Sequence, residues 1–293
     1  MFKRQKILMG LLEQFGGELS RTRLQKLLFL YGERSGSAAY EFIPYKFGCF
    51  SFQAAADCRK LAEKGLLVEG DSWKLDGTTG RYLDALDYVE RQTLWDLEKR
   101  FGSMTQRELV RHVYLSYPYY ATRSEIAEDY LDPKELETVA CCVPQAEGQG
   151  ICSIGYEGLS LEGYLNKLMR HGAQVVCDVR KNPLSRKFGF SKRTLSSALE
   201  YVGIEYRHFP ALGIVSDKRQ ALNTQADYDA LFAEYERTTL KTADDAVEEI
   251  AGLMKGKRIA LLCYEKLPEQ CHRTRVLKAV LKKHGKVCPV YWE

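Results

Sequence analysis

One short stretch of the chain holds two thiols, an imidazole and a guanidinium, from Cys263, Cys271, His272 and Arg273. Residues 258–263 form an apolar run typical of a buried strand, and apolar side chains recur at helical spacing after Arg273. We therefore expect Cys271, His272 and Arg273 at a helix start just beyond the carboxyl end of a strand, where open α/β sheets bind ligands. A helix start offers free N–H groups and positive potential, which favour anions and lower the pKa of a thiol.

Three kinds of chemistry are open to these groups. Arginines and a carboxylate would act on a phosphoester or N-glycosidic bond of a nucleotide or nucleic acid. A cysteine nucleophile of the rhodanese or phosphatase kind needs an arginine in the same loop, but Cys263 and Arg273 lie too far apart for such a loop and Cys271 and Arg273 too close. A metal at Cys263, Cys271 and His272 is the least favoured, because the cysteine spacing is unusual for zinc and no fourth ligand is evident. We expect no cofactor. Both cysteines could instead be structural.

The elements that must position this stretch alternate between strand and helix from residue 150 onward, which predicts an α/β domain with a mostly parallel sheet and flanking helices. The expected strands are residues 151–154, 175–179, 204–208, 258–263 and 287–291. The expected helices are residues 161–171, 194–202, two within 228–254, and 274–284.

Further candidate side chains follow the ends of the first two strands. Glu157 and Asp178 could act as a general base or bind a ribose hydroxyl. Asp178 could equally form a salt bridge with an arginine. Six side chains would bind the substrate, and arginines among them match phosphate geometry: Tyr156, Arg180, Arg186, Lys187, Lys192 and Arg273. The catalytic candidates are Glu157, Asp178, Cys263, Cys271 and His272.

The first half of the chain is predicted to be mainly helical. Helices are expected at residues 4–16, 21–31, 51–64, 78–101, 105–117 and 124–131, and a hairpin with a Gly-Asp turn at 66–75. Helices followed by a hairpin are the order of a winged-helix module. Five basic side chains are candidates for contacts with nucleic-acid phosphates: Arg21, Arg23, Lys26, Arg59 and Lys60. A module that binds protein instead is an equal alternative. The aromatic residues around Pro118 are expected in a core or interface rather than stacked on bases.

Two motifs carry a resemblance in this half: Arg23-Leu24-Gln25-Lys26-Leu27-Leu28-Phe29 and Tyr45-Lys46-Phe47-Gly48-Cys49-Phe50-Ser51. They resemble the winged-helix-like modules of phage- and antitoxin-associated proteins. Those modules more usually have Gly-Pro after the aromatic residue, and Cys49 stands where that proline would be.

Five segments of the second half carry a closer resemblance. They are Gly155-Tyr-Glu-Gly158, Asp178-Val-Arg180, and the segments 182–192, 206–213 and 263–273. Together they resemble the domain-of-unknown-function 488 family over residues 150–293. The resemblance implies a compact α/β domain with a pocket that accepts anions, and it implies no particular reaction.

Composition limits the remaining choices. With 293 residues, 45% of them hydrophobic and 28% charged, the chain is typical of soluble globular protein with two domains. No apolar run approaches the ~20 residues of a membrane span, so we expect no membrane partner. Nine cysteines without a regular framework, and no signal-type segment at the start, indicate a cytoplasmic protein. The net charge is only +4, but residues 1–64 hold 11 basic and 6 acidic side chains, which suits phosphate-bearing partners.

We therefore predict a winged-helix-like domain at residues 1–135, a linker at 136–149 and an α/β domain at 150–293. The favoured function is binding of, and action on, a phosphate-bearing nucleotide or nucleic acid, as a hydrolase or transferase. One alternative is a transcriptional regulator whose α/β domain senses a ligand without turnover. The other is a cysteine-dependent enzyme of the rhodanese or phosphatase kind.

Overall fold

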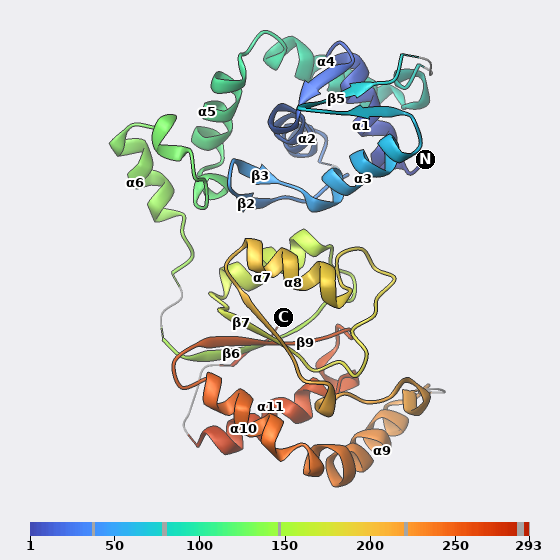
Figure 1. The fold of residues 1–293 in the computed structure, drawn as a ribbon, viewed down its shortest axis with the longest axis vertical. Coiled ribbons are helices and arrows are strands. Elements are labelled where there is room, and N and C mark those ends of the chain that lie inside the picture. The colour runs from blue at the N-terminus through green and yellow to red at the C-terminus, as the bar shows by residue number, and fades with distance from the viewer. Residues whose placement is uncertain (37–38, 78–80, 146–147, 220–221, 286–289, 293) are drawn as a thin grey trace. The chain divides into compact units, whose positions relative to one another are not determined.

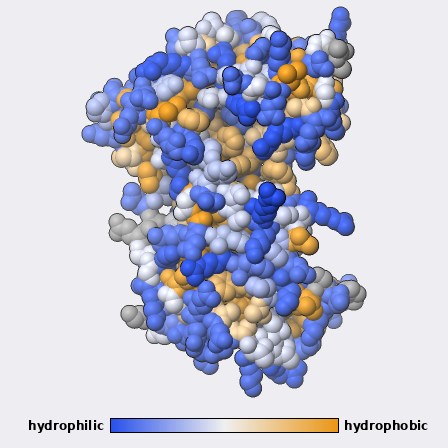
Figure 2. Space-filling model, in the orientation of Figure 1, coloured by the Kyte–Doolittle hydropathy of each residue, from blue (hydrophilic) through white to orange (hydrophobic). Residues whose placement is uncertain are grey.

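The computed structural model describes residues 1–36, 39–77, 81–145, 148–219, 222–285 and 290–292. The chain divides into two units, Met1–Val143 and Pro144–Glu293. Figure 2 shows that most of the face in view is hydrophilic, with apolar side chains in scattered patches. Among the described residues, no helix has the length and apolar character needed to cross a membrane.

The first unit packs helices around a small antiparallel sheet (Figure 1). Its helices are α1 (Lys3–Gln14), α2 (Arg21–Ser35), α3 (Phe52–Glu63), α4 (Tyr88–Phe101), α5 (Gln106–Ser116) and α6 (Pro133–Cys141). Its strands are β1 (Glu18–Ser20), β2 (Ile43–Tyr45), β3 (Gly48–Phe50), β4 (Leu67–Glu69) and β5 (Ser72–Leu75). One sheet has the order β1-β5-β4, and β2 pairs with β3 in a separate hairpin. The expected hairpin at 66–75 is confirmed, as are the first three helices.

Three sequence-based expectations for this unit are wrong. The helix expected at 78–101 begins at Tyr88, because Asp87 accepts a hydrogen bond from the Glu90 N–H and caps it. The helix expected at 124–131 is only a 3₁₀ turn at Ala127–Asp129. The linker expected at 136–149 overlaps α6 (Pro133–Cys141), a helix that Asp132 caps, so its first residues are helical.

The aromatic residues around Pro118 pack as expected. The Phe29 ring lies edge-on to the rings of Tyr117 and Tyr120, at centroid distances of 4.9 and 4.6 Å. Both tyrosines pack against the main core of the first unit.

A buried carboxylate joins three parts of this unit. Asp57 of α3 is fully buried. Its oxygens accept hydrogen bonds from Arg4 Nε at 2.6 Å, Gln5 Nε2 at 3.0 Å and the Tyr40 hydroxyl at 3.1 Å. A buried charge is tolerated only when it is paired and hydrogen-bonded, so these contacts fix α1 and α3 relative to each other.

We expect Asp57→Ala to lower the free energy of unfolding of this unit by about 3 kcal/mol, because it strands a partly buried guanidinium and two other donors. Urea denaturation followed by the fluorescence of tryptophan would measure the loss, since Trp73 is buried in the same core. Asp96→Asn, which changes an exposed carboxylate on α4, is the matched control and should change stability by less than about 0.5 kcal/mol. Equal effects of the two substitutions would contradict this account.

The second unit is a parallel sheet between two layers of helices, and the expected α/β class is confirmed. Its strands are β6 (Gly150–Gly155), β7 (Val175–Asp178), β8 (Glu205–His208), β9 (Arg258–Cys263) and β10 (Val290–Trp292). Its helices are α7 (Leu161–Arg170), α8 (Lys192–Tyr201), α9 (Gln225–Tyr235), α10 (Asp244–Leu253) and α11 (Arg273–His284). Helices α7 and α8 cover one face of the sheet, and α10 and α11 cover the other (Figure 1).

The strand order places one crevice at the carboxyl edge of this sheet. The order is β10-β6-β9-β7-β8, and every pairing is parallel. The chain moves across the sheet in one direction from β6 to β8 and returns through β9 to β10. The neighbours β7 and β9 therefore send their connections in opposite directions, and the crevice beyond their carboxyl ends is where such sheets bind ligands.

Candidate functional site

A pocket of about 310 Å³ opens at this crevice. Its lining comes from the ends of β6, β7 and β9 and from two loops: Tyr156, Arg180, Lys181, Asn182, Leu184, Ser185, Arg186, Ile214, Arg219, Cys263 and Tyr264. Four of these residues were predicted from the sequence, and the structure brings them to one place: Tyr156, Arg180, Arg186 and Cys263.

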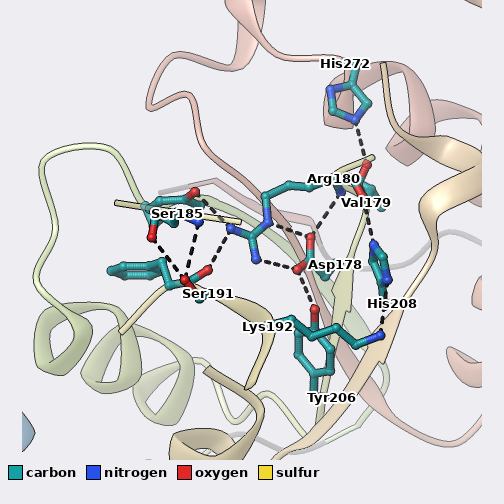
Figure 3. Close-up of polar contacts among 11 residues, drawn as sticks. Asp178, Val179, Arg180, Ser185, Ser191, Lys192, Tyr206, His208 and His272 are labelled. Atoms are coloured by element: carbon teal, nitrogen blue, oxygen red, sulfur yellow. Dashed lines mark hydrogen bonds and ion pairs between the residues drawn. The ribbon is translucent and has the colours of Figure 1, made fainter. Parts of the chain in front are cut away.

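Asp178 and Arg180 form a buried ion pair on the β7 side of the pocket (Figure 3). The Asp178 carboxylate accepts from Arg180 Nε at 2.8 Å, from Arg180 Nη2 at 2.6 Å and from the Tyr206 hydroxyl at 2.7 Å. Burial opposes the charge of Arg180, but the hydrogen bonds and charge of Asp178 outweigh it and raise the pKa of the guanidinium. Asp178 thus holds an arginine, which is the salt-bridge alternative, and it is not placed as a free base.

The loop after β7 is fixed from both ends. Arg180 Nη1 donates to the backbone oxygen of Phe190 and to the Tyr156 hydroxyl, each at 2.9 Å. The rings of Tyr156 and Phe190 stack at 4.1 Å with an interplanar angle of 8°. The Ser191 hydroxyl donates to the Ser185 carbonyl at 3.0 Å and closes the loop (Figure 3). Phe190 is therefore buried beneath the lining residue Tyr156 and is not free to contact a ligand.

Two histidines hold consecutive backbone carbonyls at the end of β7 (Figure 3). Nε2 of His272 lies 3.0 Å from the Val179 oxygen, and Nε2 of His208 lies 2.9 Å from the Arg180 oxygen. A carbonyl oxygen only accepts, so Nε2 carries the proton in both rings. Nδ1 of His272 is then free to accept, and it does so from Arg219 Nη2 at 2.7 Å.

Cys263 lies at the β9 side of the pocket among buried polar groups. Its thiol contacts Glu265 Oε2 at 3.1 Å and His272 Nδ1 at 3.8 Å. Arg219 forms an ion pair with the other oxygen of Glu265. Neither Arg219 nor Glu265 was among the sequence candidates. Glu265 could have been predicted from its position, because it follows Cys263 by two residues at the end of a strand. Arg219 could not, because it lies in an irregular segment without a strand end nearby in the sequence.

The two buried cysteines differ in acidity. Burial is the largest influence on Cys263 and opposes ionisation, but the neighbouring Cys271, His272 and Arg219 side chains lower its pKa well below the usual value of a thiol. Burial and the neighbouring Cys263 raise the pKa of Cys271 well above that value. Burial also raises the pKa of Glu265. Cys263 is therefore the more acidic thiol of the pair.

Three of these buried residues, Cys263, Cys271 and His272, are the candidate metal ligands. The donor atoms of Cys263, Cys271 and His272 lie within 4.8 Å of one another. A metal would need Nδ1 of His272, because Nε2 is used by Val179. That atom already accepts from Arg219, whose guanidinium supplies the positive charge a metal would bring. The arrangement fits a thiolate held by an arginine better than it fits a metal centre.

Other predicted site residues lie elsewhere. Glu157 is exposed and accepts from the Lys266 N–H at 3.0 Å, outside the pocket lining. Lys187 donates to the Tyr156 carbonyl at 3.0 Å. Lys192 is exposed, with Nζ 3.5 Å from His208 Nδ1.

Arg273 was expected to bind substrate at the helix start, and this expectation is wrong because the side chain is fully buried. Its Nε donates to the Ser153 hydroxyl at 2.9 Å, Nη2 donates to the Lys266 carbonyl at 3.0 Å, and Nη1 donates to the Glu265 carbonyl. It holds the loop after β9 in place and does not line the pocket.

Two of the five basic candidates of the first unit are also misplaced for phosphate contacts. Lys26 is buried and donates to the Cys49 carbonyl at 3.1 Å. Arg23 donates to the carbonyls of Phe101, Gly102 and Met104 after α4. Both follow the apolar face of α2, whose packing draws their side chains inward. The other three stay at the surface, with Arg21 paired to Glu69 and with Arg59 and Lys60 exposed on α3.

Comparison with known proteins finds a family match in the second unit only. The family model of the domain of unknown function DUF488 matches residues 160–281, in agreement with the resemblance of the second half of the sequence. No curated protein and no solved structure matches the chain. The winged-helix resemblance of the first unit stays a prediction.

We expect Arg273→Ala to destabilise the second unit by about 3 kcal/mol, since it leaves buried carbonyls and a hydroxyl without their donor. Thermal unfolding in phosphate-free buffer would measure the loss. Arg170→Ala, an exposed position on α7, is the control and should leave the melting temperature nearly unchanged. Unaltered stability of Arg273→Ala in the absence of any anion would show that the arginine is not structural.

Proposed function

We propose that the second unit binds the phosphate of a nucleotide or nucleic-acid segment in the pocket between β7 and β9, and acts on that ligand. The observation that carries this proposal is the charge of the lining, in which Arg180, Lys181, Arg186 and Arg219 face one pocket and the described lining residues include no carboxylate. The carboxylates that balance the charge, Asp178 and Glu265, lie behind Arg180 and Arg219. Because these contacts occupy the donor edges of both guanidinium groups, Arg180 and Arg219 contribute fixed positive charge to the pocket. The exposed side chains of Lys181 and Arg186 are the ones that would contact phosphate oxygens directly.

An aromatic side chain at the pocket supports a nucleotide over inorganic phosphate. Tyr264 lines the pocket, is 46% exposed and packs edge-on against Tyr156 at 5.3 Å. A half-exposed ring beside an arginine cluster is suited to stack on a base, a contact worth about 1–3 kcal/mol.

Nucleotides should raise the melting temperature of the full chain, because a ligand that binds only the folded state stabilises it by mass action. At a ligand concentration one hundred times Kd, the free energy of unfolding should rise by about 2.7 kcal/mol. Arg186→Ala should weaken this binding about tenfold, because it removes an exposed cation that lines the pocket. A thermal-shift titration with mono- and triphosphates and short oligonucleotides would show both effects.

The matched control is Arg193→Ala, which removes an exposed arginine from α8, outside the lining, and should bind like the wild type. No stabilisation by any phosphate compound, or equal losses in the two variants, would refute the anion pocket.

Exposed cations on α3 favour a second function, nucleic-acid binding by the first unit. The first three helices, the β4–β5 hairpin that follows α3 and the three-stranded sheet support a winged-helix module, although a further hairpin, β2–β3, lies between α2 and α3. Arg59 and Lys60 are exposed near the end of α3, just before the β4–β5 hairpin.

Binding of the full chain to duplex DNA or RNA should weaken steeply with salt, since each phosphate contact releases counterions. Arg59→Ala combined with Lys60→Ala should reduce the slope of log affinity against log salt by about 2. Electrophoretic mobility shifts at several salt concentrations would give the slopes. The control Lys99→Ala with Arg100→Ala removes the same charge from exposed positions of α4, and identical slopes in the two double variants would rule this surface out.

A further inference from the structure

We propose that Cys263 is the nucleophile of the second unit and attacks the phosphorus of a phosphate ester bound in the pocket. The inference rests on the proposed function, because the same arginines must hold the phosphate. It goes further in naming the reacting atom and the reaction class, transfer of a phosphoryl group to a thiolate.

The position of Cys263 supports this role. The residue ends β9, the strand beside β7 at the crevice, and it lines the pocket with Arg180, Arg186 and Arg219. It is only 1% exposed, so a reagent reaches its sulfur through the pocket. A phosphate held by those arginines would lie next to the thiol.

Its neighbours supply what a thiolate needs. Glu265 Oε2, at 3.1 Å from Sγ, is placed to accept the thiol proton. Arg219 bridges Glu265 and His272 Nδ1, and its charge favours the anion. Loop length argued against such an arginine at the sequence level. The structure supplies it from residue 219, which lies outside the loop that joins Cys263 to Arg273.

The chemistry balances without any further co-reactant. The thiol proton passes to Glu265, and the bond between Cys263 Sγ and phosphorus forms as the bond from phosphorus to the ester oxygen breaks. The ester oxygen leaves with the alcohol and takes that proton from Glu265. A water molecule then cleaves the sulfur–phosphorus bond: its oxygen and one proton leave with the phosphate, and its other proton restores the Cys263 thiol.

Alkylation of the full chain at pH 6.5 tests the nucleophile, with rates for each cysteine read by peptide mass spectrometry. Cys263 should react with iodoacetate at least tenfold faster than Cys141, an exposed thiol of the same chain, and inorganic phosphate should protect it. Buried Cys152, whose pKa burial raises to about 12, should barely react. Cys271→Ala should shift the pH midpoint of Cys263 labelling upward, and Cys271→Ser, which keeps a donor, should restore part of the shift.

Incubation with p-nitrophenyl phosphate tests the reaction itself. A phosphoryl group on the peptide containing Cys263, absent in Cys263→Ser, is the expected result. Labelling of Cys263 no faster than Cys141, failure to find the adduct, or stoichiometric zinc whose removal alone makes Cys263 reactive would each overturn the proposal. These outcomes differ from failure of the pocket, in which Cys263 still reacts fast but phosphate neither protects it nor stabilises the chain.

Discussion

The buried ion pair between Asp178 and Arg180 is the contact on which the rest of the second unit's site depends. Two charges removed from water are stable only when hydrogen bonds satisfy them, and here Tyr206, Tyr156 and the Phe190 carbonyl complete the set. The pair thereby ties β7 to β8, to the end of β6 and to the following loop. Without it, neither the position of Arg180 nor the course of residues 182–191 would be determined.

A second ion pair, between Arg219 and Glu265, repeats this arrangement on the other side of the crevice. In both pairs the arginine lines the pocket and the carboxylate does not. The pairing lets cations stand close together, since each repulsion is offset by a nearby opposite charge. The electrostatic potential in the pocket therefore depends on how the two ion pairs are oriented. Neutralising either carboxylate would also release its arginine side chain from a fixed position, in addition to raising the net positive charge.

The sequence predicted those parts of the fold that follow from local pattern. Four strands of the parallel sheet were expected to within one residue at each end, because buried runs such as 258–263 are bounded by polar turns. Of the fifth, expected at 287–291, residues 287–289 lie outside the part of the chain that the structure describes. Asp178, Arg180 and Cys263 could be named because strand ends gather at one edge. Arg219 could not, since its place depends on tertiary contacts of an irregular segment. Lys26 and Arg273 were misassigned for the opposite reason: charge suggested a ligand, whereas packing had enclosed both side chains and given them carbonyl partners.

The walls of the pocket are set by the approach of backbones as much as by side chains. A Cβ atom on Gly155 would lie 1.8 Å from the Glu265 oxygen, and one on Gly213 would lie 2.0 Å from the Lys181 nitrogen. Only glycine permits these two contacts, which bring the loops bearing Glu265 and Lys181 to the crevice. Each loop is then held by hydrogen bonds, from Arg273 in one case and from the Arg180 guanidinium in the other. The cations and the thiol therefore belong to one preorganised framework, and preorganised charge can stabilise charge that develops in a transition state without reorganisation at the moment of reaction.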